Sequence, residues 1–158
     1  YRAPDFTDLN DMMKRSRSSG FGAEVKKRIM LGTFAITSEN YEKYYKKAMQ
    51  VRANLSSSFD RLFERFDAIM CPTSPSAAGP LGFKETDNTR MYLSDIYTVS
   101  ANIAGLPALS VPCGFTSDGL PVGVQFMGRR FCDAKIVCFA AEYQRVTDWH
   151  KRLPKGAI

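Results

Sequence analysis

The sequence predicts an α/β layered fold in which long helices pack on a mixed sheet. Long segments of helical periodicity alternate with short apolar segments, and prolines and glycines bound the short ones. Two of the predicted strands are joined by only residues 115–121, which favours a sheet that is mixed rather than wholly parallel. Because no internal repeat or composition shift is present, we predict a single domain over residues 1–158.

Three helices are predicted in the first part of the chain. They cover residues 5–15, 23–36 and 40–66, and a polar loop is expected at residues 16–22. The second helix reads IMLGTFAI from Ile29 onward, with Thr33 as its only polar residue. A helix that is apolar all round is usually buried. We therefore expect this helix to be buried, with Arg28 at its mouth.

The rest of the chain predicts the sheet and its covering helices. Strands are expected at 68–71, 108–111 and 122–127, helices at 90–104 and 133–145, and a loop at 76–89. Gly105 followed by Pro107 ends the first of these helices, and Asp118-Gly119 marks a turn. The segment 71–75, CPTSP, follows a strand and is expected to line the rim of a site.

Composition and charge exclude several classes of protein. The net charge of +6 is spread along the chain, with 11 Lys and Arg in residues 1–60 and 11 in residues 61–158, so no basic patch for DNA is predicted. No apolar run approaches the roughly 20 residues that a membrane span needs. The four cysteines contain no CxxC pair, so we expect no metal site. The chain begins at Tyr1 without a methionine, and we expect it to be a piece of a longer polypeptide.

The sequence offers no convincing catalytic nucleophile. The serines at 16–19 and 56–58 lack flanking glycines, and there is no G-x-S-x-G motif. The only histidine, His150, lies near the C-terminus, which makes a Ser-His-Asp triad a poor interpretation. We therefore assign no catalytic residue within the chain.

Two charged residues stand on otherwise apolar helices. Asp95 falls on or beside the packed face of the helix at 90–104, where a buried carboxylate would need a partner. Arg28 stands at the start of the apolar helix. Taken from the residues alone, both are either structural ions, pairing with each other or with the backbone, or ligands of a zwitterionic substrate.

Two long motifs carry a resemblance to a known family. They are YLSDIYTVSANIAGLPALSVPCGFTSDGLPVGVQFMG at 92–128 and SSGFGAEVKKRIMLGTFAI at 18–36. The chain resembles the C-terminal part of the amidase signature family, and within it the glutaminase subunits of tRNA-dependent amidotransferases. The resemblance implies part of an α/β/α sandwich. It also implies a Ser-cisSer-Lys triad upstream of this chain, so that the fragment alone is inactive.

The resemblance also implies a function and a set of partners. Such enzymes form Gln-tRNA(Gln) from Glu-tRNA(Gln) with glutamine and ATP, and Arg28 and Asp95 match the residues that hold the glutamine carboxylate and ammonium. The chain would need no cofactor, because a B subunit uses ATP and Mg²⁺ and contacts most of the tRNA, while a C subunit holds the other two together. The compartment would be the cytoplasm, or a mitochondrial or plastid matrix.

Two other functions remain open. The chain can be part of a stand-alone amidase of the same family that acts on a different amide. It can also be a non-catalytic interaction module, in which the helices serve as an interface.

Overall fold

The computed structural model describes residues 1–82 and 87–153. The chain forms two compact units, Tyr1–Val51 and Arg52–Ile158, which are described separately below. The predicted loop at 76–89 falls partly on residues 83–86, which lie outside the described residues.

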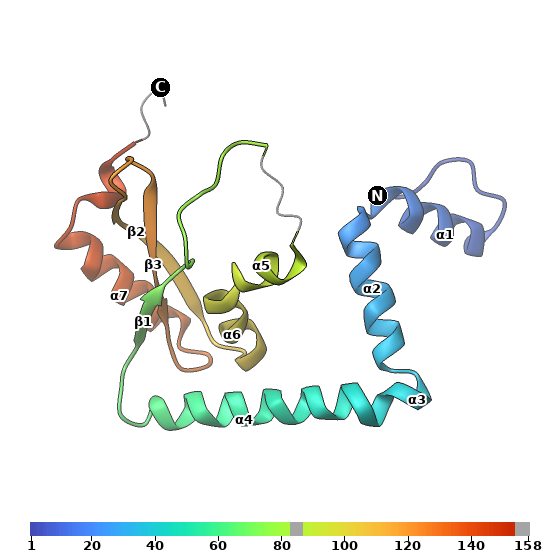
Figure 1. Ribbon diagram of the computed structural model, residues 1–158, viewed down its shortest axis with the longest axis horizontal. Helices are drawn as coiled ribbons and strands as arrows, with labels where there is room; N and C mark the ends of the chain where they lie inside the picture. Colours follow the sequence, from blue (N-terminus) through green and yellow to red (C-terminus); the bar gives the residue numbers. More distant parts are fainter. Residues whose placement is uncertain (83–86, 154–158) are drawn as a thin grey trace. The chain divides into compact units, whose positions relative to one another are not determined.

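The first unit is helical. It contains α1 (Leu9–Gly20), α2 (Ala23–Ala35), the short α3 (Ser38–Asn40), the π-helical segment η1 (Tyr41–Lys46) and the first turn of α4 (Lys47–Leu62) (Figure 1). The prediction of a loop at 16–22 was wrong in its first part. Asp8 caps α1, its side chain accepting a hydrogen bond from the backbone N–H of Asp11 at 2.9 Å, and the helix then continues to Gly20.

The burial predicted for α2 is not found. The helix lies where the periodicity places it, but none of its residues is buried. Met30 is 72% exposed and Leu31 60%. An apolar sequence indicates that a helix needs a covering surface, and within this unit the contact of Phe34 with Tyr44 leaves the helix largely exposed.

The second unit has a three-stranded sheet with helices on both faces. Its strands are β1 (Ile69–Pro72), β2 (Ala108–Phe115) and β3 (Pro121–Met127), in the order β1-β3-β2, and both described pairs are antiparallel. Its helices are α5 (Asn88–Leu93), α6 (Ile96–Ala104), α7 (Asp133–Arg145) and η2 (Trp149–Lys151), together with most of α4 (Figure 1). The α/β class and the predicted strands are confirmed.

Alternate side chains of β3 point to opposite faces of the sheet and build two cores. On one face α6 and the end of α4 cover the strand with Phe63, Ala101, Ala104, Leu106 and Met127. On the other face α7 packs against the sheet. The core there consists of Val111, Val124 and Phe126 from the strands and Ile136 and Ala140 from α7. The sheet is therefore the middle of three layers.

The helix predicted at 90–104 is broken into α5 and α6. Ser94 donates its hydroxyl to the backbone carbonyl of Met91 at 2.6 Å, and Asp95 has φ −99° and ψ 7°. Side-chain hydroxyls that bond to nearby carbonyls compete with the helical pattern. The break makes Asp95 the N-cap residue of α6, rather than a residue within a continuous helix.

Candidate functional site

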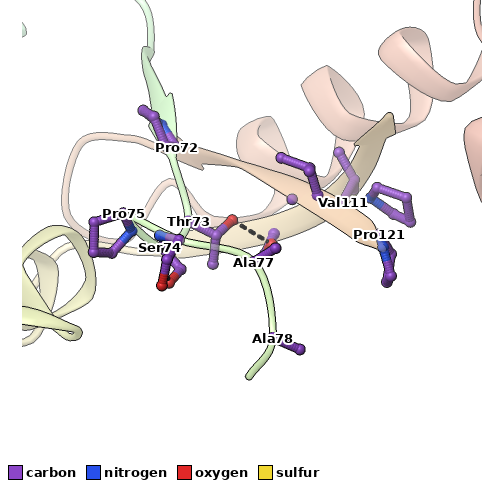
Figure 2. Close-up of a pocket in the computed structure, with 13 residues that line it drawn as sticks. Pro72, Thr73, Ser74, Pro75, Ala77, Ala78, Val111 and Pro121 are labelled. Carbon is purple, nitrogen blue, oxygen red and sulfur yellow. Dashed lines mark hydrogen bonds between the residues drawn. The ribbon is translucent and has the colours of Figure 1, made fainter. Parts of the chain in front are cut away.

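A cleft lies at the end of the sheet in the second unit. It has a volume of about 750 Å³, which is in the range of small-molecule sites. Its walls come from three segments, residues 72–78, 110–112 and 121–123 (Figure 2). None of these described residues is charged. Residues 72–75 of the predicted CPTSP rim therefore line a hollow, and Cys71 does not.

A smaller polar cavity adjoins this cleft. It measures about 300 Å³ and is lined by Thr73, Thr98, Ala101, Asn102, Leu106, Ala108, Leu109, Ser110 and Gln125. Thr73 and Ser110 line both hollows. Their hydroxyl oxygens are 2.6 Å apart and share a hydrogen bond, which is drawn in Figure 2. We call this pair the hydroxyl bridge.

Strand register brings the polar side chains of this cavity together. Ser110 of β2 and Cys71 of β1 are both opposite Gln125 of the central strand. The hydroxyl bridge then passes over Gly123, where an added Cβ would lie 3.0 Å from both hydroxyl oxygens. A larger residue at Gly123 would therefore displace the bridge.

The cavity is closed on its other side by α6, whose C-terminal end is held in place. Gly105 ends the helix with φ 69°, a left-handed conformation that favours glycine. Arg52 donates to the carbonyl of Ile103 at 3.1 Å, and Arg130 to that of Ala104 at 3.0 Å. Cations at a helix C-terminus stabilise it.

Asp95 lies at the other end of the same helix. Thr98 and Asn102, three and seven residues further on, line the cavity, so the N-cap residue belongs to the same helix face. Its backbone carbonyl accepts from the Thr98 and Val99 amides at 3.0 and 2.9 Å. Asp95 is exposed, and its carboxylate has no partner among the residues that the structure describes. The expected structural partner is thus absent there, because water solvates a carboxylate that is not buried.

Arg28 lies on the exposed surface of α2 in the first unit. Its Nε donates to Glu24 Oε1 at 3.1 Å, one turn earlier in the helix. The side chain is 64% exposed, so the expectation that it stands at the mouth of a buried element is wrong within this unit. Its terminal nitrogens have no partner in the described part of the chain. Arg28 and Asp95 belong to different units, and their convergence on one ligand stays a prediction.

Neither a metal site nor a membrane span is found among residues 1–82 and 87–153. No group of three or more His, Cys, Asp or Glu side chains there is arranged to hold a metal ion. No described helix combines the length and apolarity needed to cross a bilayer.

Sequence reasoning missed the polar residues that the sheet and α6 bring together. These are Thr98, Asn102, Ser110 and Gln125. A signal was present, because Gln125 interrupts the apolar strand VGVQFM and Ser110 interrupts ALSVP. Polar residues in buried strands are expected to have partners, but the register that pairs these two is a tertiary property.

Comparison with known proteins places this architecture in a family of amide-cleaving enzymes. The sequence profile of the Amidase family matches residues 3–137. The chain therefore belongs to the amidase family.

Within this family, the chain is similar to curated relatives that are A subunits of glutamyl-tRNA(Gln) amidotransferase. The chain is 50% identical over 156 residues to this protein of Thiobacillus denitrificans, and 53% identical to that of Thioalkalivibrio sulfidiphilus. Both alignments cover 99% of this chain and 32% of the relative, of which they match the C-terminal portion. The chain thus spans about a third of the length of these relatives.

Solved structures agree with this similarity. The crystal structure of the A subunit of glutamyl-tRNA(Gln) amidotransferase from Thermotoga maritima matches with a TM-score of 0.65 and 44% identity, over 88% of this chain and 30% of that one. A further amidase, at 23% identity and a TM-score of 0.66 over 86% of this chain and 31% of that one, has the same fold.

Proposed function

We propose that this chain is part of the glutamine-hydrolysing subunit of a tRNA-dependent amidotransferase, and that Arg28 and Asp95 hold the substrate glutamine. The observation that carries the proposal is the exposed Asp95 carboxylate at the start of α6, the helix that lines the polar cavity. This carboxylate has no partner among the described residues, and it belongs to a chain about half identical to the A subunits of such enzymes. Free glutamine presents a carboxylate and an ammonium on one carbon. An arginine fork suits the carboxylate, and an aspartate suits the ammonium.

We assign the remaining parts of the reaction to the rest of the parent protein and to its partner subunits. The Ser-cisSer-Lys triad would lie in the part of the protein that precedes this chain. Formation of Gln-tRNA(Gln) from Glu-tRNA(Gln) would need a B subunit that uses ATP and Mg²⁺ and a C subunit that holds the complex together. We place the assembled enzyme in the cytoplasm or in a mitochondrial or plastid matrix.

Substitution of the two charged residues tests the glutamine assignment. In the assembled enzyme that carries this chain, Arg28→Ala and Asp95→Asn are each expected to raise the KM for glutamine about 10- to 100-fold, since each removes one charge-assisted hydrogen bond. The measurement is steady-state amidation of Glu-tRNA(Gln) at varied glutamine concentration.

Free ammonia supplies the control, because it bypasses glutamine binding and hydrolysis. Both variants should keep normal amidation with ammonium chloride, which shows that the complex is intact. Lys27→Ala, next to Arg28 on α2, and Asp118→Asn, on an exposed turn, are matched charge removals that should leave the glutamine KM unchanged. Unaltered glutamine kinetics in both Arg28→Ala and Asp95→Asn would refute the assignment.

A further inference from the structure

The C-terminal half of α6 is fixed to the rest of the second unit by packing and by hydrogen bonds. Ala101 and Ala104 are buried in the core on one face of the sheet. Arg52 and Arg130 donate to the last two carbonyls of the helix, those of Ile103 and Ala104. This end of the helix therefore has little freedom to shift.

The N-terminal half of α6, which follows Asp95, is packed less closely. None of residues 96–100 is buried, and the apolar side chains of Ile96 and Val99 are 52% and 43% exposed. A helix end with few buried apolar contacts opens or tilts at a low cost in free energy. The end of α6 that carries the carboxylate thus needs another attachment.

Gln125 supplies that attachment. Its Nε2 donates to the backbone carbonyl of Tyr97, two residues after Asp95, at 3.0 Å. Ser100 Oγ donates to the same carbonyl at 3.2 Å, but that bond stays within the helix. Among the described residues, the bond from Gln125 is the one that joins the first half of α6 to the sheet by a side chain.

Gln125 is well placed to act as a rigid anchor. It is 4% exposed and lies in β3, the central strand of the sheet. Its Nε2 also donates to Cys71 Sγ of β1 at 3.4 Å, so both amide hydrogens are directed. Because a backbone carbonyl can only accept, the contact with Tyr97 fixes which end of the side-chain amide is nitrogen. A buried hydrogen bond of this kind is stronger than one in water.

The strength of a charge-assisted hydrogen bond depends on where its acceptor is held. A displacement of about 1 Å at a binding group is enough to weaken binding and catalysis strongly. We propose that Gln125 is a positioning residue for glutamine, which ties the first turn of α6 to the central strand and so holds the Asp95 carboxylate where the substrate ammonium binds. Gln125 would act through Asp95, so this role rests on the proposed function.

The experiment measures glutamine kinetics of the assembled amidotransferase that carries this chain. Gln125→Met keeps the size of the side chain and removes its hydrogen bonds. It should raise the KM for glutamine about three- to tenfold, the effect of one lost neutral hydrogen bond, with kcat nearly unchanged. Amidation with ammonium chloride should stay normal, because ammonia bypasses glutamine binding.

Gln125→Asn is the second variant, in case the apolar side chain prevents assembly. It keeps the amide but shortens its reach toward the Tyr97 carbonyl by one methylene group. It should also raise the KM for glutamine and leave amidation with ammonia intact.

A double variant tests whether Gln125 acts through the carboxylate. With Asp95→Asn already present, adding Gln125→Met should change the glutamine KM little further, because the charge that Gln125 positions is gone. A direct contact between Gln125 and the ligand would instead give independent, multiplying effects.

Phe126→Leu is the matched control. Phe126 is the next residue of β3 and belongs to the core on the opposite face, beneath α7. This variant should destabilise the same unit without changing the glutamine KM. A purely structural role of Gln125 would make the two variants alike.

The proposal is supported by a raised KM in either Gln125 variant that disappears on the Asp95→Asn background and is not seen in Phe126→Leu. A normal KM in the Gln125 variants, with a raised KM in Asp95→Asn, would overturn it and leave the glutamine assignment standing. Multiplying effects in the double variant would also overturn it, as would failure of both Gln125 variants to assemble. If Asp95→Asn has a normal KM, the glutamine assignment of Asp95 fails, and the positioning role fails with it.

Discussion

Charged side chains of this chain act mostly at exposed positions, where single ion pairs contribute little. The pair between Lys135 Nζ and Asp67 Oδ1, at 2.7 Å, is one that joins segments far apart in the sequence. The hydrogen bond from Lys135, and then its charge, lower the pKa of the Asp67 carboxyl below its ordinary value. This pair connects the segment before β1 to the first turn of α7.

Its contribution to stability should depend on pH. A carboxyl whose pKa is lower in the folded than in the unfolded chain stabilises the fold above the unfolded pKa. That stabilisation is lost as the pH falls through the folded pKa. Asp67→Asn should therefore lower the free energy of unfolding at neutral pH, and the difference from wild type should vanish in strong acid. Urea denaturation across this range measures it.

Lys135→Gln serves as the companion variant for this prediction. It removes the same interaction, so adding Asp67→Asn to it should produce almost no further pH-dependent loss. A difference between wild type and Asp67→Asn that grows on acidification would contradict the assignment.

At the scale of elements, the close approach of α7 to the sheet depends on a residue without a side chain. Gly128 follows β3 and is buried, and a Cβ added there would lie 2.5 Å from Ile136 Cγ1. Ile136 is 2% exposed and cannot move aside without disturbing its neighbours. Gly128 directly follows β3, the strand in which Gln125 is paired with Ser110 of β2.

Gly128→Ala should therefore destabilise the second unit by about 1–3 kcal/mol, the usual cost of overpacking a core. Thermal or denaturant unfolding measures this loss. Ile136→Ala is also destabilising by itself, since it leaves a cavity. In the double variant the new methyl group occupies part of that space, so the combined loss should be smaller than the sum. Additive losses would show that the two residues do not contact each other.

Considered as a whole, the molecule exposes apolar side chains on both of its units. Phe34 and Ile29 in the first unit are 51% and 49% exposed, and Ile96 in the second is 52% exposed. The chain spans about a third of its curated relatives, and we propose that the remainder of the parent protein covers these faces and supplies the nucleophile.

The purified 158-residue chain should consequently release no ammonia from glutamine above the buffer background. The assembled amidotransferase, measured in the same coupled assay, is the positive control. Turnover by the chain that Ser110→Ala or Ser74→Ala abolishes would contradict the prediction, because it would place a nucleophile within these residues.

Much of the secondary structure was predictable because its signals are local. Residues 133–145 form α7 as predicted, and Gly105 ends α6 in the left-handed conformation expected of it. The break at Asp95 was missed because the Ser94 hydroxyl competes for a helical carbonyl, which apolar periodicity does not show. The burial of α2 was wrongly predicted, because burial depends on a covering surface.

The candidate site was only partly accessible to such reasoning. Arg28 and Asp95 were identified by resemblance, and their role in binding glutamine stays a prediction. Asn102, Ser110 and Gln125 lie on three different elements, and no short motif joins them in the sequence. Strand pairing and the docking of α6 bring them to one cavity.

The α/β class, the positions of most helices and strands, and the kinship with amidases could be inferred from the sequence, because each follows from local patterns of residues. The exposure of Asp95 at a helix start and the neutral polar cavity beneath α6 became evident from the folded chain alone. The physical reason is that exposure and hydrogen-bond satisfaction depend on which surfaces meet, and segments distant in sequence supply those surfaces.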